Sequence, residues 1–340
     1  MASKIPVVFY KYDASPFAMK VKNALLLKKI PHYTVDVSMT APRPELSTLL
    51  GISYRRIPIL AIGSDVYCDT SLITSILERR FPQSSGYGTL FPVRNGSGGK
   101  RDTGMIKAWT ISYMDRVIFP LGAACLPYNK FPAEFVKDRG EWLGKPIDVQ
   151  KLIDAQPHIA STLSSHLTLL EEQLSDGREW LFDTESPGLG DLSAHFVYSW
   201  IQYFRALKGV LDPDHFPASI AWIARMTAYL SSSEKSNAAP FEKITGEKAA
   251  EIVTSSPFED PSVVGFDTIE ATRLGLVQGN EVSVAPDDSG KDVLTYGILV
   301  GLSREEVVLE TRGTVGSAVR CHFPRLNFIV RSVGEGKSKL

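Results

Sequence analysis

The alternation of hydrophobic and polar positions predicts a β-α-β order at the start of the chain. Pro6 to Tyr10 is apolar enough for a buried strand, and Tyr33 to Val37 alternates as a second strand. Between them, Phe17 to Lys29 repeats apolar residues at helical spacing. Pro16 stands at the start of this helix, where its missing N–H is tolerated.

Two further strands and a helix complete this first layer. Ile57 to Ala61 and Asp65 to Tyr67 flank a Gly-Ser turn, which is a hairpin signal, and Thr70 to Arg80 has a helical pattern that ends at Phe81-Pro82. The order β-α-β followed by β-β-α is that of a thioredoxin-like layer. We therefore expect a thioredoxin-like domain over residues 1–82.

The next part of the chain has helical patterns only. Residues 83–101 are rich in Gly and Ser and are predicted to be a linker. An all-helical domain is predicted over residues 102–250. Its strongest helical runs lie around Trp109–Phe119, Ile159–Leu174, Leu192–Leu207 and Ile220–Leu230.

After residue 257 the pattern changes to short strands separated by Gly, Asp and Ser turns. The predicted strands are Glu281–Ala285, Leu294–Leu302, Glu306–Thr311, Ala318–His322 and Asn327–Val333. Five strands in so few residues predict a separate small all-β barrel over residues 257–335, with an SH3-like arrangement as one candidate.

Composition narrows the classes of function. Hydrophobic residues make up 44% of the 340 residues and charged residues 22%, with a net charge of −1. A nucleic-acid partner normally requires a strong basic excess, so none is expected. No stretch of eighteen apolar residues is present, so no membrane partner is expected either. The three cysteines are far apart in the sequence and have no metal-ligand spacing, so no metal site is expected.

The last three residues carry a targeting signal. Ser338-Lys339-Leu340 is a terminal peroxisomal address of the S-K-L type. It predicts a peroxisomal location, with the cytoplasm as the alternative.

Candidate chemistry begins at Ser15, directly before Pro16-Phe17. This turn resembles the active-site turn of glutathione transferases of the serine and cysteine types, such as the tau and omega classes. The resemblance implies that Ser15 is catalytic and donates a hydrogen bond that stabilises the thiolate of glutathione. The structural alternative is a plain helix N-cap, a position that favours Ser. Tyr10 and Tyr12 are rival hydroxyls.

A second motif resembles the same family. Arg55-Arg56-Ile57-Pro58-Ile59-Leu60 is similar to the family's basic–basic–aliphatic–Pro–x–Leu element, whose proline is cis. The resemblance implies that the backbone of Ile57, beside Pro58, pairs with the cysteinyl part of glutathione. It also implies that Arg56 meets the glycyl carboxylate. The alternative is an edge-strand proline with two solvated arginines.

A third motif lies at the start of the next helix. Asp69 and Thr70 fall where the family has Glu-Ser, eleven and twelve residues after Pro58. The resemblance implies that they hold the γ-glutamyl amine and carboxylate. Helix capping is the alternative.

The resemblance extends through the helical half, to about residues 5–245. Gly188 to Asp191 looks like the family's folding element, with an acid at the third helical position. Similarly extended members occur among fungi. A pocket for the electrophile is expected between the halves, although core packing is the favoured role for any one of its aromatic candidates. The candidates are Phe17, Trp109, Tyr113, Arg116 and Phe119.

The implied function is a glutathione-dependent enzyme that adds the thiol to an electrophilic small molecule. Conjugation and glutathione-assisted isomerisation need the same residues, and the resemblance also implies a homodimer. The rival interpretation is a non-catalytic ligand-binding or protein-interaction module on the same fold.

Overall fold

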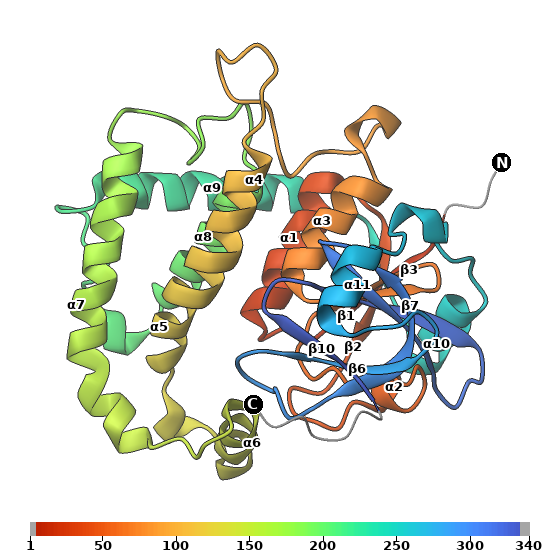
Figure 1. Ribbon diagram of the computed structural model, residues 1–340. Helices are drawn as coiled ribbons and strands as arrows, with labels where there is room; N and C mark the ends of the chain where they lie inside the picture. Colours follow the sequence, from red (N-terminus) through yellow and green to blue (C-terminus); the bar gives the residue numbers. More distant parts are fainter. Residues whose placement is uncertain (1–4, 334–340) are drawn as a thin grey trace.

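The computed structural model describes residues 5–333 and begins with the predicted thioredoxin-like layer (Figure 1). The predicted elements are confirmed, with ends that differ by at most two residues. They are β1 (Val7–Lys11), α1 (Pro16–Lys28), β2 (His32–Asp36), β3 (Ile59–Ile62), β4 (Asp65–Cys68) and α3 (Thr70–Arg80). A short helix that was not predicted, α2 (Pro44–Ser47), follows β2.

The two faces of this layer pack against different partners. β1 runs parallel to β2 and antiparallel to β3. Because successive side chains of a strand point to opposite faces, Phe9 joins the core with α1, α3 and the helical half, whereas Tyr10 joins the core on the other face.

The helical half gathers on the side of the layer where α1 and α3 lie (Figure 1). Its middle segment η2 is a π-helix, a form that is rare and often found at functional sites. The segments are α4 (Thr103–Ala108), η2 (Trp109–Ile118), α5 (Phe119–Ala124), α6 (Ala133–Leu143), α7 (Val149–Leu174), α8 (Leu189–Ile201) and α9 (Pro217–Lys235). Short 3-10 turns connect several of these elements.

The predicted folding element begins α8. One carboxylate oxygen of Asp191 accepts the N–H of Gly188 at 3.1 Å, which is the acidic half of a capping box, since Gly188 has no side chain to supply the other half. The other accepts the N–H of Leu181 at 2.9 Å and the indole N–H of Trp222 at 3.0 Å. This buried carboxylate therefore joins α8, α9 and the segment before them.

After α9 the chain returns to the first layer, which the sequence pattern did not predict. β5 (Phe241–Lys243) adds to β2 as a parallel strand. Helix α10 (Gly246–Thr254) then packs against α2, β2 and β9. Its alanines and valine lie in the core on the Tyr10 face.

Five strands follow, as predicted, and a short helix α11 (Thr268–Leu274) precedes them. They are β6 (Glu281–Pro286), β7 (Thr295–Leu302), β8 (Glu306–Arg312), β9 (Ala318–Pro324) and β10 (Phe328–Ser332).

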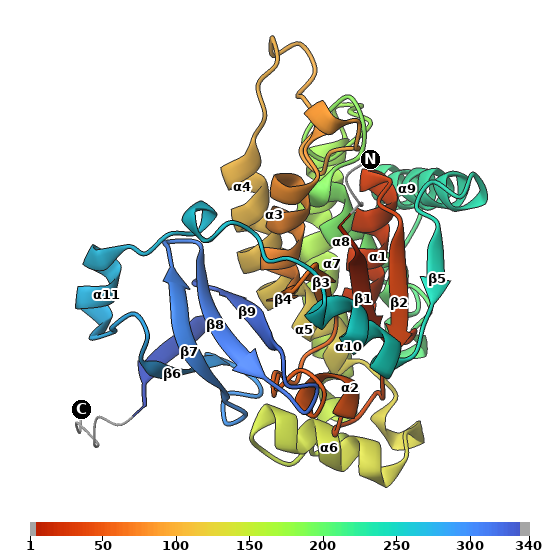
Figure 2. The same cartoon turned by 90° about the vertical axis from the view of Figure 1, so that its right-hand side faces the viewer.

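The C-terminal strands are not separate from the first layer, contrary to the prediction, and an SH3-like barrel is not shown. The five strands continue the N-terminal layer as one mixed sheet of ten strands, in the order β10-β6-β7-β8-β9-β4-β3-β1-β2-β5. Figure 2 shows β6 to β9 beside the N-terminal strands. β9 pairs with β4 in parallel, with Asp65 opposite Arg320 and Tyr67 opposite His322. Within residues 5–333, β9 and β10 do not pair with each other, so the strands do not close. The physical reason is that β4 offers an unpaired edge, and β9 covers it.

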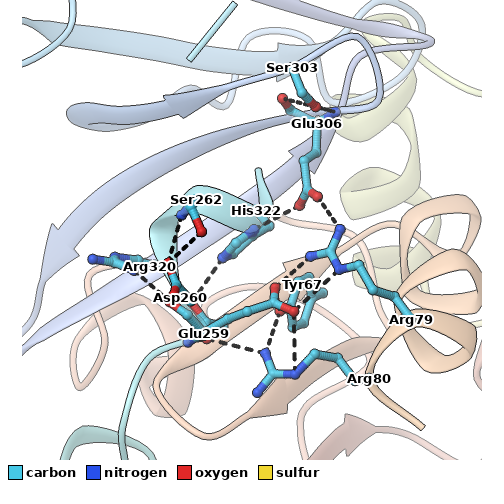
Figure 3. Close-up of polar contacts among 11 residues, drawn as sticks. Tyr67, Arg79, Arg80, Glu259, Asp260, Ser262, Ser303, Glu306, Arg320 and His322 are labelled. Atoms are coloured by element: carbon cyan, nitrogen blue, oxygen red, sulfur yellow. Dashed lines mark hydrogen bonds and ion pairs between the residues drawn. The ribbon is translucent and has the colours of Figure 1, made fainter. Parts of the chain in front are cut away.

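A buried network of charges crosses the junction of β4 and β9 (Figure 3). His322 on β9 lies between two carboxylates, with Nδ1 2.8 Å from Glu306 and Nε2 3.1 Å from Asp65. All three side chains are buried. Both ring nitrogens therefore face an acceptor, which favours the protonated imidazolium.

Two arginines of α3 complete this network. Arg79 bridges Glu306 at 2.5 Å and Glu259 at 2.6 Å, and Arg80 contacts Asp65 at 3.4 Å. The hydroxyl of Tyr67 accepts from Arg80 at 3.0 Å. Charges from α3, β4, β8, β9 and the segment before α11 thus meet in one place.

Two of the scattered cysteines also meet at this junction. The sulfur atoms of Cys68 on β4 and Cys321 on β9 lie 3.6 Å apart as free, buried thiols.

In the part of the chain that the structure describes, we find no helix long and apolar enough to cross a membrane. The expected targeting signal, Ser338-Lys339-Leu340, lies outside the described residues.

Candidate functional site

Ser15 lies at the start of α1, as its position before Pro16 predicts. Its Oγ accepts the N–H of Ala18 at 3.1 Å, so it is the N-cap of this helix. The same hydroxyl donates to the carbonyl oxygen of Ile57 at 3.4 Å. The side chain is buried, with 3% exposure. Ser15 therefore has the capping role and, in addition, contacts the second motif.

The rival tyrosines are differently placed. Tyr10 is buried in the core on the opposite face of the sheet, and burial raises the pKa of its hydroxyl. The hydroxyl of Tyr12 accepts a hydrogen bond from Arg139 of α6 at 3.4 Å.

The second motif turns at a cis peptide bond between Ile57 and Pro58, as the resemblance implies. Among the described residues, the N–H of Ile57 has no hydrogen-bond partner. An unpaired backbone N–H beside the Ser15 hydroxyl is the kind of group that an extended peptide can pair with.

The two arginines of this motif are not free in solvent. Each binds an aspartate, one in α6 and the other between β6 and β7. Arg55 binds the carboxylate of Asp138 in α6 at 2.5 Å. Arg56 binds the carboxylate of Asp288, the carbonyl of Ser289 at 2.8 Å and the hydroxyl of Ser289 at 3.2 Å. Asp288 and Ser289 belong to the loop between β6 and β7, which we call the β6–β7 loop (residues 287–294).

The third motif begins α3. Asp69 is the N-cap and accepts from the N–H of Ser71 at 3.0 Å and from its hydroxyl at 2.6 Å. Thr70 is the first residue of the helix and is buried. The Asp69 carboxylate also faces Arg56 at 4.0 Å. The structure thus brings the three motifs together, since Ser15 contacts Ile57 and Arg56 faces Asp69.

The five expected pocket residues divide into three groups. Phe17 and Phe119 pack together, with ring centres 4.5 Å apart. Trp109 and Tyr113 pack on each other at 6.1 Å inside the helical half, where Tyr113 also contacts His166 at 2.8 Å.

Arg116 forms the third group by itself. It points to the β6–β7 loop, where it binds Asp287 at 2.8 Å. Of the five, only Phe119 therefore packs on Phe17, which is itself a residue of α1, the helix that Ser15 caps.

A charged pair that the sequence analysis did not select lies beside the Phe17 ring. Lys20 of α1 is buried and binds both carboxylate oxygens of Asp115 in η2, at 2.8 and 2.9 Å. Burial raises the pKa of Asp115 to about 6, although Lys20 opposes this shift. The sequence did contain a signal for this lysine. Residues four positions apart lie on the same face of a helix, so Lys20 shares the apolar face of Ala24 in the predicted helix, where a charged side chain needs a partner.

Sequence analysis also missed Asp287 and Asp288. The run Asp287-Asp288-Ser289-Gly290 has the composition of a turn, and nothing in it indicates which arginines it contacts.

Two cavities lie away from these motifs. One, of about 260 Å³, is lined by residues 201–205 and 207–211, and the other, of about 730 Å³, lies between α7 and residues 209–216. Neither is lined by a residue of the three motifs.

Comparison with known proteins agrees with this architecture. Residues 9–85 match the model of the glutathione S-transferase N-terminal domain, and residues 123–235 match a domain family of unknown function. The search of curated proteins yields no match.

Solved structures extend the likeness over almost the whole chain. A GST-like protein from Pseudomonas syringae has 23% identity and a TM-score of 0.70, with 96% of this chain and 99% of that chain covered. The β-etherase LigF from a Sphingobium strain has 17% identity and a TM-score of 0.50, with 68% and 100% covered. Rice GST1, solved with glutathione, has 19% identity and a TM-score of 0.49, with 74% and 97% covered. The chain therefore has the fold of a GST-like protein, in which a thioredoxin-like N-terminal domain, a helical half and C-terminal strands share one mixed sheet.

Proposed function

We propose that this chain is a glutathione-dependent enzyme that activates the glutathione thiol for addition to an electrophilic small molecule. The observation that carries the proposal is the contact of the Ser15 hydroxyl with the carbonyl of Ile57 at 3.4 Å. In this proposal the hydroxyl lies beside the backbone that pairs with the cysteinyl part of glutathione. The N-terminus of α1 adds a positive dipole end that favours a thiolate.

The chemistry of the surrounding residues fits glutathione. Arg56 already holds a carboxylate, that of Asp288, and a glycyl carboxylate is the same kind of group. Asp69 is a partly exposed carboxylate, which suits an ammonium group. Ile57 has an unpaired N–H for the peptide. In the proposed complex Ile57, Asp69 and Thr70 orient the tripeptide, and Arg56 lies at its glycyl end with Asp288 as a competing carboxylate. Ser15 stabilises the charge on sulfur.

Phe17 and Phe119, with the Lys20–Asp115 pair beside Phe17, are the proposed side of the site for the electrophile. Conjugation and glutathione-assisted isomerisation both begin with the same thiolate, so the proposal covers both.

Replacement of Ser15 tests the proposal. We expect Ser15→Ala and Ser15→Gly to lower turnover by about 10- to 100-fold, the scale of one hydrogen bond to a charged group, with a smaller change in glutathione affinity. The measurements are a thiol-conjugation assay with a chloronitrobenzene electrophile and calorimetry with glutathione.

The two substitutions together separate catalysis from capping. Loss of the cap costs about 1 kcal/mol with Ala and only a few tenths with Gly, whereas both remove the hydroxyl. Equal losses of turnover support the thiolate role. Unchanged turnover in both variants, or a loss that follows the melting temperature, would contradict it.

A specific observation favours a second candidate function. Arg56 binds Asp288 and Arg116 binds Asp287, so two arginines near the candidate site are already paired within the chain. A non-catalytic binding or interaction module does not need these arginines for glutathione. Retention on immobilised glutathione without any conjugation activity would favour this alternative.

A homodimer and peroxisomal delivery remain predictions from the sequence. Sedimentation of the purified chain tests the first. Comparison of tagged chains with and without residues 338–340 tests the second.

A further inference from the structure

The β6–β7 loop brings its acidic side chains to the residues of the proposed glutathione site. Asp288 and Arg56 are 232 positions apart in the sequence, yet their side chains are in direct contact. Resting on the proposed function, we propose that Asp288 is a specificity-determining residue that disfavours thiols with a carboxylate at the Arg56 end of the site.

The first step of the argument concerns Arg56. Its Nη2 atom is bound by three acceptors of the loop: the carboxylate of Asp288 and both oxygens of Ser289. Its Nη1 atom faces Asp69 at 4.0 Å. A ligand carboxylate at Arg56 therefore meets a guanidinium that is already neutralised, with two like charges close by.

The second step concerns the loop, which is held independently of Arg56. Asp287 binds Arg116 at 2.8 Å through its side chain, and its N–H donates to the carbonyl of Asn327 at 3.0 Å. The N–H of Gly290 donates to the carbonyl of Trp142 at 2.7 Å.

Gly290 also allows a close approach that other residues would not. It has a φ of +71°, and an added Cβ would lie 3.1 Å from the ring of Trp142. Asp288 is thus presented by an anchored loop, and a ligand must compete with a fixed contact rather than with a free side chain.

The consequence is a preference that can be measured. A thiol whose glycyl carboxylate is esterified is neutral at this end, so Asp288 does not repel it. The free glycyl carboxylate of glutathione is negative and is repelled by Asp288. The native chain should therefore bind glutathione monoethyl ester at least as tightly as glutathione. Removal of the Asp288 charge should shift the preference towards glutathione, because Arg56 is then free to bind the glycyl carboxylate.

The test combines two ligands with three full-length proteins: the native chain, Asp288→Asn and Asp292→Asn. Asp292 lies on the same loop, is exposed and makes no contact with Arg56, so its variant is a matched control for charge. We expect Asp288→Asn to shift the ratio of the two dissociation constants by about tenfold in favour of glutathione, the scale of one charged contact at a partly exposed site. Asp292→Asn should leave the ratio unchanged.

The outcomes separate this inference from the proposed function. If both ligands bind but the ratio is the same in all three proteins, the role of Asp288 is overturned and the glutathione site stands. If neither ligand binds any of the three proteins, the proposed function is overturned, and this inference with it. Circular dichroism checks that Asp288→Asn is folded, and Asp288→Ser serves as a second variant that also removes the charge.

Discussion

Replacement of His322 by Gln is expected to lower the free energy of unfolding by about 3 kcal/mol near pH 5.5, the scale for one partner lost from a buried ion pair. His322 is the cation between Asp65 and Glu306, and both carboxylates are buried. Without it, Arg79 and Arg80 still contact the two carboxylates, but no charge lies between them. Because these groups join β4 to β9, the loss weakens the contact between the N-terminal layer and the C-terminal strands.

This stabilisation should depend on pH in a defined direction. Burial by itself lowers the pKa of His322, but Asp65 and Glu306 outweigh it and raise the pKa above the ordinary value of 6.5. A histidine whose pKa is raised by folding contributes fully below its unfolded pKa and loses its contribution as the pH rises through the folded pKa. For Asp65 and Glu306, burial is the largest single influence and acts to raise the pKa. Contacts with His322, joined by the Glu259 N–H and Arg80 at Asp65 and by Arg79 at Glu306, together outweigh it and lower the two pKa values below 3.8 and 4.5. Their contribution is lost as the pH falls through these lowered values.

The network should therefore stabilise the fold most between about pH 4.5 and 6.5. Urea unfolding of the native chain and His322→Gln across pH 4 to 9 measures the difference. We expect a gap that is largest in this window and narrows towards pH 9. His158→Gln, at an exposed position, is the matched control and should change stability by less than about 0.5 kcal/mol. A gap that is constant with pH would show that the charge of His322 is not what stabilises the junction.

The second large effect is expected at Asp191. Its carboxylate accepts the buried N–H groups of Leu181, Gly188 and the Trp222 indole. Asp191→Ala leaves all three donors without a partner, at about 1–3 kcal/mol each, so we expect a loss of about 4 kcal/mol and poor yield of folded protein. Thermal unfolding, followed by circular dichroism and tryptophan fluorescence, measures the change.

Two further variants make this prediction specific. Asp191→Asn keeps one acceptor oxygen and should lose less stability than Asp191→Ala, because two of the three donors can still be satisfied. Asp214→Ala, on an exposed loop, should be nearly neutral. If Asp191→Ala is no less stable than Asp214→Ala, the carboxylate does not hold the helical half together.

Local sequence determined much of this fold. Helix α3 occupies the predicted residues, and the five C-terminal strands lie within two residues of their predicted ends, since periodicity and turn composition are properties of neighbouring residues. The capping roles of Ser15 and Asp191 were also predictable, because a cap bonds to N–H groups three positions away. The cis bond before Pro58 and the position of Asp69 at a helix start followed from the resemblance of short motifs.

Only the tertiary structure decided where the distant parts meet. The pairing of β9 with β4 joined the C-terminal strands to the first layer, from which they were expected to be separate. Edge strands pair through backbone groups that are alike in every residue, so this pairing leaves no signal in the sequence. The three residues of β5 are too few to show a period, and their strand exists only because β2 offers an edge. Likewise, Asp288 has the local signature of a turn, and its contact with Arg56 depends on the path of the whole chain between them. Which charged residues meet across such a sequence distance is decided by how the chain packs. The contact between Arg56 and Asp288 therefore could not be predicted from the residues next to either one in the sequence.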